Sequence, residues 1–353
     1  MGKISHSLTV SFRTDGDEEL YRGTSFARKG IEDQVVIKES SITISFERAK
    51  QKLPEEVLDS SMSYIRTHLE RALMYYLAVK GNIPECDGVT YRYGFGKTES
   101  MEGTAEIIRQ WKDFKVNYTL SPEACGRLFR GSDGELLSLV NPISFFLWSQ
   151  LSDSPHEAFR AAWSSLNALY TNIAAKDTQE EKKLRKLSEF IKGHDMERAC
   201  GFVMDIDNDR FWKDLRWYGF MEKNASNWRF KTFFQEQYAD EAKRDALLGD
   251  ILYSRLFDKI EACQELKDES RDRADFFAGK KDSDKYCVPV NRVEFLVCFY
   301  CYYKRNKSVH AGDAYPLFII SEKSENYAEP VLTELLWNVI SDIIEEKYGA
   351  CES

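Results

Sequence analysis

The N-terminal third of the chain alternates hydrophobic and polar residues over short stretches. Alternation with a period of two is typical of strands that bury one face. It occurs in four segments, 8–12, 41–46, 89–93 and 116–120. The turn signal Asp87-Gly88 directly precedes the third of them. The pattern therefore predicts four strands of a small sheet.

One segment in this region has helical spacing instead. Hydrophobic residues recur every three or four positions between Pro54 and Gly81, from Val57 to Leu77. Proline is favoured in the first turn of a helix and glycine just past its end. Residues 1–120 are therefore predicted to form an α+β region, a small sheet with one helix packed on it. A role in sensing a trigger or binding a partner suits such a region.

The chain changes to helical patterns after Ser121-Pro122. Ser154 and Glu157 form a capping box with Pro155 in the first helical position. Another helix is expected to begin at Pro330 and to end at Gly349. Residues 121–353 are therefore predicted to be helical, with a charged insertion around 176–285. The fold class expected for the whole chain is mainly α, with an α+β N-terminal region.

Composition and charge narrow the class of protein. Hydrophobic residues make up 43% of the 353 residues, enough for a large core, and the formal net charge is −9. A protein that coats a duplex nucleic acid is usually basic, so nucleic-acid contact here requires a local basic groove. The N-terminus has no hydrophobic signal-peptide core, and no apolar stretch reaches 18 residues. We therefore expect a cytoplasmic protein that does not enter a membrane.

The segment from about Asn291 to Arg305 is hydrophobic almost all round, which predicts a buried central helix. We expect this helix to end near Arg305, because Gly312 prevents a long continuation. Directly at this end stand Arg305, Asn306 and His310. These three residues are the candidate catalytic site.

The residue types at this site suit the chemistry of a phosphodiester. A guanidinium can bind the phosphate and offset the charge of the transition state. An imidazole that titrates near neutrality can move a proton to or from a ribose hydroxyl. Asn306 can hold either group by hydrogen bonding. Lys304 and Lys307 are the candidate substrate-binding residues, because they raise the local potential for an RNA substrate.

The spacing sets a geometric condition. Five residues of uninterrupted helix turn about 500°, which leaves Arg305 and His310 about 140° apart. They share a pocket only if the helix stops or bends between them. A bare pair of Arg and His at such a spacing is expected about once by chance in this chain. The prediction therefore depends mainly on Asn306 and on the expected helix end.

The segment 305–312 (RNKSVHAG) at the end of an aromatic helix resembles the R-polar-x(3–5)-H motif of the HEPN ribonuclease superfamily. The upstream segment 159–170 (FRAAWSSLNALY) and the helix from Pro330 are similar to the helices that flank that motif. The resemblance covers roughly residues 150–348. The charged insertion around 176–285 departs from the family pattern and could cover or reshape the cleft.

The resemblance implies a helical bundle that forms a homodimer, with two motifs in one cleft. It implies a metal-independent endoribonuclease without a cofactor, which cleaves RNA by attack of the RNA's own 2′-hydroxyl in toxin–antitoxin or antiphage systems. Arg305 would bind the phosphate, Asn306 would orient it, and His310 would be the acid and base. An antitoxin or a trigger protein would then be a further partner. The alternatives are a non-catalytic HEPN-like module for dimerisation or partner binding, and an unrelated helical interaction protein in which the spacing of Arg305 and His310 is accidental. For His310 itself, the alternative is a solvated loop histidine after a helix end.

Other motifs have simpler interpretations. Cys298 and Cys301 have the spacing of metal ligands, but Cys287 is the only further cysteine nearby in the sequence, and two buried thiols are expected. Gly94 and Gly96 lie in a segment that is expected to be a turn between strands, because a phosphate loop would need a helix directly behind it. The basic run 182–186 is interleaved with acidic residues and predicts a solvated helix face.

Overall fold

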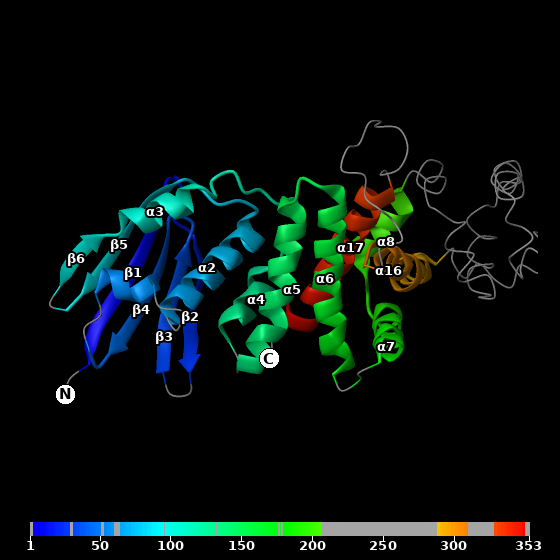
Figure 1. Ribbon diagram of the computed structural model, residues 1–353, viewed down its shortest axis with the longest axis horizontal. Helices are drawn as coiled ribbons and strands as arrows, with labels where there is room; N and C mark the ends of the chain where they lie inside the picture. Colours follow the sequence, from blue (N-terminus) through cyan, green and yellow to red (C-terminus); the bar gives the residue numbers. More distant parts are fainter. Residues whose placement is uncertain are drawn as a thin grey trace, which may run out of the picture. The chain divides into compact units, whose positions relative to one another are not determined.

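The computed structural model describes residues 3–28, 31–50, 53–59, 64–94, 96–130, 133–175, 177, 179–206, 288–309 and 328–349. The chain forms two compact units. The first unit contains Met1–Asn172 together with Ile340–Ser353, and the second contains Ile173–Val339. Figure 1 shows the elements of both units, and each unit is described by itself.

The first unit is built on a six-stranded antiparallel sheet with the strand order β2-β3-β4-β1-β5-β6. The strands are β1 (Ile4–Phe12), β2 (Glu19–Arg28), β3 (Ile31–Lys38), β4 (Ser41–Arg48), β5 (Cys86–Tyr93) and β6 (Lys97–Ser100). In the register of β1 with β4, Leu8 lies opposite Ile44 and Val10 opposite Ile42. These side chains are fully buried. The strand alternation therefore gives the sheet one hydrophobic face.

Three of the four predicted strands are confirmed, as β1, β4 and β5. The fourth prediction, at 116–120, is wrong. Val116 and Leu120 donate backbone hydrogen bonds to the carbonyls of Gly81 and Ala78, at the end of the helix that spans residues 64–80. Both side chains are buried there, so their alternation marks a loop that covers a helix end.

The Asp87-Gly88 pair is inside β5 and does not form a turn before it, which corrects the predicted strand start. The pairing of β1 with β5 shifts register between Ser11, opposite Gly88, and Phe12, opposite Cys86. Glycine is common at such irregularities because it bends a strand without steric cost. Gly94 and Gly96 both have positive φ and lie between β5 and β6, which confirms the predicted turn.

Helix α2 (Tyr64–Lys80) lies across the hydrophobic face of the sheet (Figure 1). The other helical segments described in this unit are α1 (Pro54–Asp59), α3 (Glu102–Arg109), α4 (Pro122–Gly126), the 3-10 turn η1 (Arg127–Phe129), α5 (Asp133–Leu151), most of α6 (Pro155–Ala174), the end of α17 (Ala328–Ile344) from Ile340 onward, and the π-helical turn η4 (Glu345–Gly349). The predicted helix between Pro54 and Gly81 is found as α1 and α2 (Tyr64–Lys80), with residues 60–63 outside the described part. Gly81 ends α2 with a φ of 78°.

Two tyrosines of α2 fix the helix on the sheet. The hydroxyl of Tyr75 donates to the carbonyl of Leu20 at 2.6 Å, and that of Tyr76 donates to the carbonyl of Glu39 at 2.8 Å. Both rings are buried. Each therefore joins a hydrophobic contact to a hydrogen bond that satisfies a buried polar group.

Helices α5 and α6 are joined by polar contacts as well as by their hydrophobic faces. Ser154 accepts a hydrogen bond from the backbone of Glu157 at 3.4 Å, which confirms the serine half of the predicted capping box at the start of α6. Pro142 lies inside α5 and has no N–H for the carbonyl of Ser138, four residues earlier. The side-chain amide of Asn172 on α6 donates to that carbonyl at 2.6 Å, so α6 satisfies the group that the proline leaves open.

The second unit contains α7 (Glu180–Gly193), α8 (Glu197–Asp205), α15 (Pro289–Phe295), the π-helical turn η3 (Leu296–Cys301), α16 (Tyr302–Val309) and α17 (Ala328–Ile344) up to Val339. α15, η3 and α16 follow each other without a gap and form one continuous helix, called here the motif helix. The helix predicted there is confirmed, but both its ends were placed wrongly: it begins at Pro289, before Asn291, and extends to Val309, beyond Arg305. A proline in the first helical position favours the earlier start.

The helix predicted from Pro330 is α17, and it begins two residues earlier, at Ala328. Most of the predicted insertion around 176–285 lies outside the described residues, as do His310 and Gly312. Among the described helices, none combines the length and the apolar character that crossing a membrane requires.

The division between the two units differs from the predicted boundary at 120 and 121. Helices do replace strands after Ser121, as predicted. The compact units, however, divide at Asn172 and again at Val339, within α17. The predicted boundary at Ser121 marks a change in secondary structure. The boundaries at Asn172 and Val339 depend on which elements pack together, and the hydrophobic pattern of the sequence does not indicate this packing.

Candidate functional site

The motif helix is anchored near its beginning by two charged residues. The carboxylate of Glu294 accepts a hydrogen bond from Ser188 on α7 at 2.7 Å and lies 3.6 Å from the ammonium group of Lys192. Arg292 donates to the carbonyl of Val203 on α8 at 3.1 Å. Because Glu294 is buried, its contacts with Ser188 and Lys192 satisfy a carboxylate that would otherwise destabilise the core. Together with the hydrogen bond from Arg292, they fix the motif helix against α7 and α8.

The end of the motif helix carries the candidate catalytic residues. The guanidinium of Arg305 donates to the side-chain oxygen of Asn306, with 2.9 Å between Nη1 and Oδ1. Both side chains are half-buried. An arginine held by a neighbouring amide loses less conformational entropy when it binds a phosphate. The structure therefore brings two of the three predicted catalytic residues together.

Lys304, predicted to contact the substrate, has another partner. Its ammonium group lies 3.0 Å from the carboxylate of Glu329 at the start of α17. The side chain of Lys304 is 16% exposed and that of Glu329 is 3% exposed. A buried carboxylate without a cation is costly, so this pair has a structural role between α16 and α17. The side chain of Lys307 lies outside the described residues.

The continuous helix up to Val309 limits where Arg305 and His310 can meet. Arg305 and Val309 are four residues apart and so lie about 40° apart on the same helix face. His310 follows directly and would be about 140° away if the helix continued. The expected helix end between the two residues is absent through Val309, so proximity of Arg305 and His310 within one chain requires the chain to leave the helical path at His310.

The other motifs from the sequence have structural roles. Cys298 and Cys301 are buried in the motif helix, as predicted, and burial raises the pKa of the Cys301 thiol. On α7, Arg185 and Lys186 both pair with Glu189, at 3.2 and 2.9 Å, and their side chains are at least half exposed. The prediction of a solvated helix face for this basic run is therefore confirmed.

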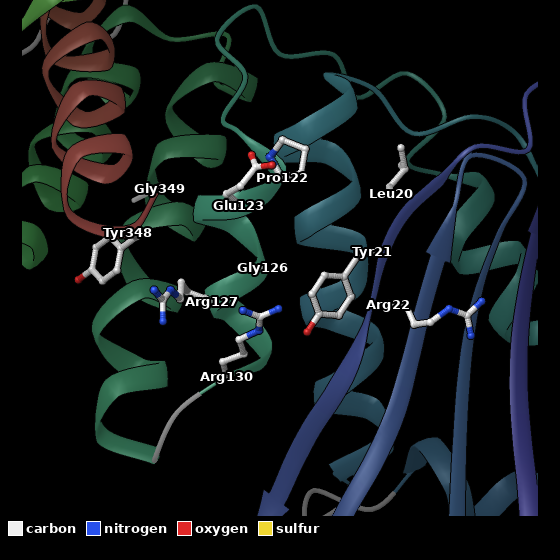
Figure 2. A pocket seen from close by; sticks show the side chains of 10 residues that line it. All are labelled: Leu20, Tyr21, Arg22, Pro122, Glu123, Gly126, Arg127, Arg130, Tyr348 and Gly349. Carbon is white, nitrogen blue, oxygen red and sulfur yellow. The ribbon is translucent and has the colours of Figure 1, made fainter. Parts of the chain in front are cut away.

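The first unit contains a pocket that the sequence did not indicate (Figure 2). It has a volume of about 400 Å³. Its lining residues come from β2, from α4 and η1, and from η4: Leu20, Tyr21, Arg22, Pro122, Glu123, Gly126, Arg127, Arg130, Tyr348 and Gly349. In Figure 2 the side chains of Arg127 and Arg130 lie between Tyr348 and Tyr21, whereas that of Arg22 projects to the other side of β2.

A weak sequence signal for this pocket exists in the segment 126–130. Arg127 and Arg130 flank Leu128 and Phe129, which are both fully buried. A pair of arginines three residues apart around two core residues places both cations on the same exposed side of a short turn. Tyr21 and Tyr348 are more than 300 residues apart in the sequence, and nothing in the local pattern of either indicates that they line one cavity.

Comparison with models of known protein families, with curated proteins and with solved structures gave no match to this chain. The function proposed below therefore depends on the residues and their geometry, and on the resemblance of the motif.

Proposed function

We propose that the chain is a metal-independent endoribonuclease of the HEPN type that acts in a toxin or antiphage defence role. The observation that supports the proposal is the hydrogen bond between Arg305 and Asn306 at the end of the motif helix. It orients a guanidinium in the last turns of the motif helix, five residues before His310 in the sequence. Arg305 would bind the scissile phosphate there.

In the proposed reaction the 2′-hydroxyl of the RNA attacks the adjacent phosphorus. A bond forms between the 2′-oxygen and phosphorus, and the bond to the 5′-oxygen of the next nucleotide breaks. His310 would accept the proton of the 2′-hydroxyl or donate a proton to the leaving 5′-oxygen. Arg305 and the amide nitrogen of Asn306 would stabilise the negative charge that builds up on the phosphate oxygens.

A second candidate is a HEPN-like module without catalytic activity. The continuous helix through Val309 favours it, because a helical path at the next residue would turn His310 away from Arg305. The ion pair of Lys304 with Glu329 also favours it, because a predicted substrate contact is engaged within the chain. The two candidates differ in whether RNA is cleaved, so one experiment separates them.

The test is cleavage of a labelled RNA by the purified full chain in EDTA. We expect Arg305→Ala and His310→Ala each to lower the rate by about 100-fold or more, as is usual for a lost phosphate clamp or general acid. Asn306→Ala should lower the rate less, by about tenfold, because it removes an orienting hydrogen bond. RNA with 2′-deoxy substitutions should not be cut at the substituted positions, since the attacking hydroxyl is missing.

Two matched variants control for a general effect of losing a charge or a ring. Arg160 is an exposed arginine on α6, and His194 is an exposed histidine after α7. Arg160→Ala and His194→Ala should cleave RNA at the rate of the unmodified chain. Cleavage that survives in both Arg305→Ala and His310→Ala, or that also occurs at 2′-deoxy positions, would contradict the proposed site.

A further inference from the structure

The pocket of the first unit combines two cations with a small cavity. Arg127, the first residue of η1, and Arg130, which directly follows η1, both line it. In a chain with a net charge of −9, two neighbouring arginines in one cavity create a local positive potential. Guanidinium groups are suited to bind phosphate or carboxylate through paired hydrogen bonds.

The hydroxyl of Tyr21 adds a polar group at the same end of the cavity. Tyr21 is only 8% exposed, and its hydroxyl oxygen is buried beside the guanidinium of Arg130. Burial raises the pKa of this hydroxyl, and the nearby Arg130 lowers it in part. The hydroxyl is therefore protonated at neutral pH and able to donate to an anion beside Arg130.

Packing on both sides holds the walls of the cavity in place. The ring of Tyr21 lies 4.6 Å from that of Phe129 and 5.5 Å from that of Tyr75, measured between ring centroids. On the opposite wall, Glu345 accepts hydrogen bonds from the backbone and the hydroxyl of Ser121, at 2.7 and 2.5 Å. This joins η4, which carries Tyr348, to the first residue before α4. A preformed cavity binds a ligand without the cost of ordering its walls.

The rest of the lining differs from the arginine end. Pro122 and Leu20 contribute apolar surface, and the carboxylate of Glu123 lies beside Pro122 (Figure 2). Such an end can receive a flat ring and accept hydrogen bonds from sugar hydroxyls or amino groups. A single phosphate ion would leave most of the cavity unfilled, because about 400 Å³ is within the range of pockets for small organic ligands, about 300–1,000 Å³.

We propose that this pocket binds a nucleoside phosphate, with the phosphate on Arg127, Arg130 and Tyr21 and the nucleoside toward Pro122 and Glu123. The ligand could be a free nucleotide or the terminal nucleotide of an RNA strand, which share this chemistry. The site lies in the first unit and does not depend on the ribonuclease proposed for the second. Binding to it would give the first unit a defined ligand.

The test is titration of the full chain with adenosine monophosphate, followed by calorimetry, with adenosine and inorganic phosphate as separate probes. We expect saturable binding of the nucleotide at one site per chain. Adenosine should bind at least about tenfold more weakly, because it lacks the charged group, and inorganic phosphate should compete with the nucleotide. Arg130→Ala should weaken nucleotide binding by about tenfold, and the double variant Arg127→Ala/Arg130→Ala by about 100-fold.

Conservative and matched variants keep the result interpretable. Tyr21→Phe retains the ring against Phe129 and removes only the hydroxyl, so it should weaken nucleotide binding without changing the fold. Arg160→Ala removes an exposed arginine elsewhere in the first unit and should bind the nucleotide like the unmodified chain. Circular dichroism of each variant confirms that the fold is retained.

Competition by a short 2′-O-methyl RNA with a 5′-phosphate, which resists cleavage, separates the two sources of the ligand. Stronger competition by this RNA than by its 5′-hydroxyl form would assign the site to strand ends, and competition by the free nucleotide alone would assign it to free nucleotides.

The proposal is overturned if the unmodified chain shows no saturable binding of the nucleotide. It is also overturned if the double variant binds it as tightly as the unmodified chain. Neither result depends on whether the chain cleaves RNA.

Discussion

A buried carboxylate lies in the core of the first unit, at Asp33 on β3. It forms an ion pair with Arg48, with 2.7 Å between Oδ2 and Nη2, and the same oxygen lies 3.3 Å from Nε2 of His68. The hydroxyl of Ser25 lies 2.8 Å from the other ring nitrogen of His68. The contacts from Ser25 to His68 and from His68 to Asp33 resemble those of a catalytic triad. However, these three residues have at most 1% of their surface exposed. Their role here is to satisfy one another inside the core.

The surroundings of Asp33 determine its charge. Burial acts to raise the pKa of Asp33, but the hydrogen bonds from Arg48 and His68, together with the positive charge of Arg48, outweigh burial and lower it. The carboxylate is therefore ionised in the folded chain. Its stabilising contribution is complete above about pH 4, the ordinary range of an aspartate, and is lost as the pH falls through the lower pKa of the folded state.

Asp33→Asn is predicted to lower the free energy of unfolding of the first unit by about 3 kcal/mol at pH 7, because it leaves Arg48 without its buried partner. The difference between the unmodified chain and the variant should shrink as the pH falls below about 4. Urea titration at pH 7 and pH 3, followed by hydrogen exchange of β3 and α2, measures it. The control is Glu47→Gln, which removes an exposed carboxylate on β4 and should leave stability unchanged. An equal loss of stability in Asp33→Asn at both pH values would contradict this account of the charge.

The same residue explains why β3 was not predicted from the sequence. Its inward-facing positions are Asp33, Val35 and Ile37, and all three are buried. A charge at the first of them breaks the alternation of hydrophobic and polar residues on which strand prediction depends. Only the partners Arg48 and His68, which are 15 and 35 residues further on, make a buried aspartate possible. The strand β6 was missed because none of its four residues is buried, so it has no alternation of hydrophobic and polar residues.

At the scale of elements, the connection after α2 depends on one glycine. Gly81 has a φ of 78°, a conformation that is costly for residues with a Cβ. Its N–H donates to Leu77 and its carbonyl accepts from Val116, so the turn ends the helix and begins the next loop. An added Cβ would lie 3.1 Å from the carbonyl oxygen of Val116. The sequence correctly indicated this glycine as a helix end, because a left-handed residue there is common.

Gly81→Ala is predicted to destabilise the first unit by about 1–2 kcal/mol, from the left-handed backbone and the close contact with Val116. Gly103, in the first turn of α3, is the matched control, because it is exposed and an added Cβ meets no atom within 4 Å. Gly103→Ala should instead raise stability by about 0.5 kcal/mol, since alanine restricts the unfolded chain. Thermal unfolding of both variants measures the two opposite signs. Equal effects would show that the conformation of Gly81 is not what matters.

The elements near the candidate site show where sequence patterns stop being informative. The buried helix that carries Arg305 was predicted from its hydrophobic residues alone. Its end was not, because the residues from Lys304 to Ser308 are polar or charged and fit a helix that leaves the core as well as a loop. The π-helical turn η3 within it could not be predicted either. Hydrogen bonds five residues apart do not change the hydrophobic pattern enough to be recognised.

At the scale of the whole molecule, the sequence predicted a sheet region followed by helices, and the structure has both. It did not predict that residues from Ile340 onward would belong to the first unit. The reason is visible at Ser121, whose backbone and hydroxyl both donate to Glu345, 224 residues later. Neither residue belongs to a local motif that would indicate this contact. Long-range contacts of this kind also form the pocket, whose two tyrosines come from opposite ends of the sequence.

The proposed function makes a prediction for the assembled molecule. In the HEPN family, which the motif resembles, two copies of the motif meet in one cleft, so cleavage should require a dimer. We expect sedimentation at micromolar concentration to give twice the mass of one chain. On dilution the specific activity should fall in parallel with the fraction of dimer, because separated chains hold only half of the cleft.

Mixing two inactive variants tests the same requirement directly. Chains with Arg305→Ala and chains with His310→Ala, combined at equal concentration and allowed to exchange, should form mixed dimers that carry one intact Arg305 and one intact His310. Random pairing makes about half of the dimers mixed. If the two residues act together across the cleft, these mixed dimers should restore activity to the mixture. Each variant mixed with itself serves as the control and should stay inactive. A chain that cleaves RNA as a monomer, with a specific activity independent of concentration, would show that Arg305 and His310 meet within a single chain.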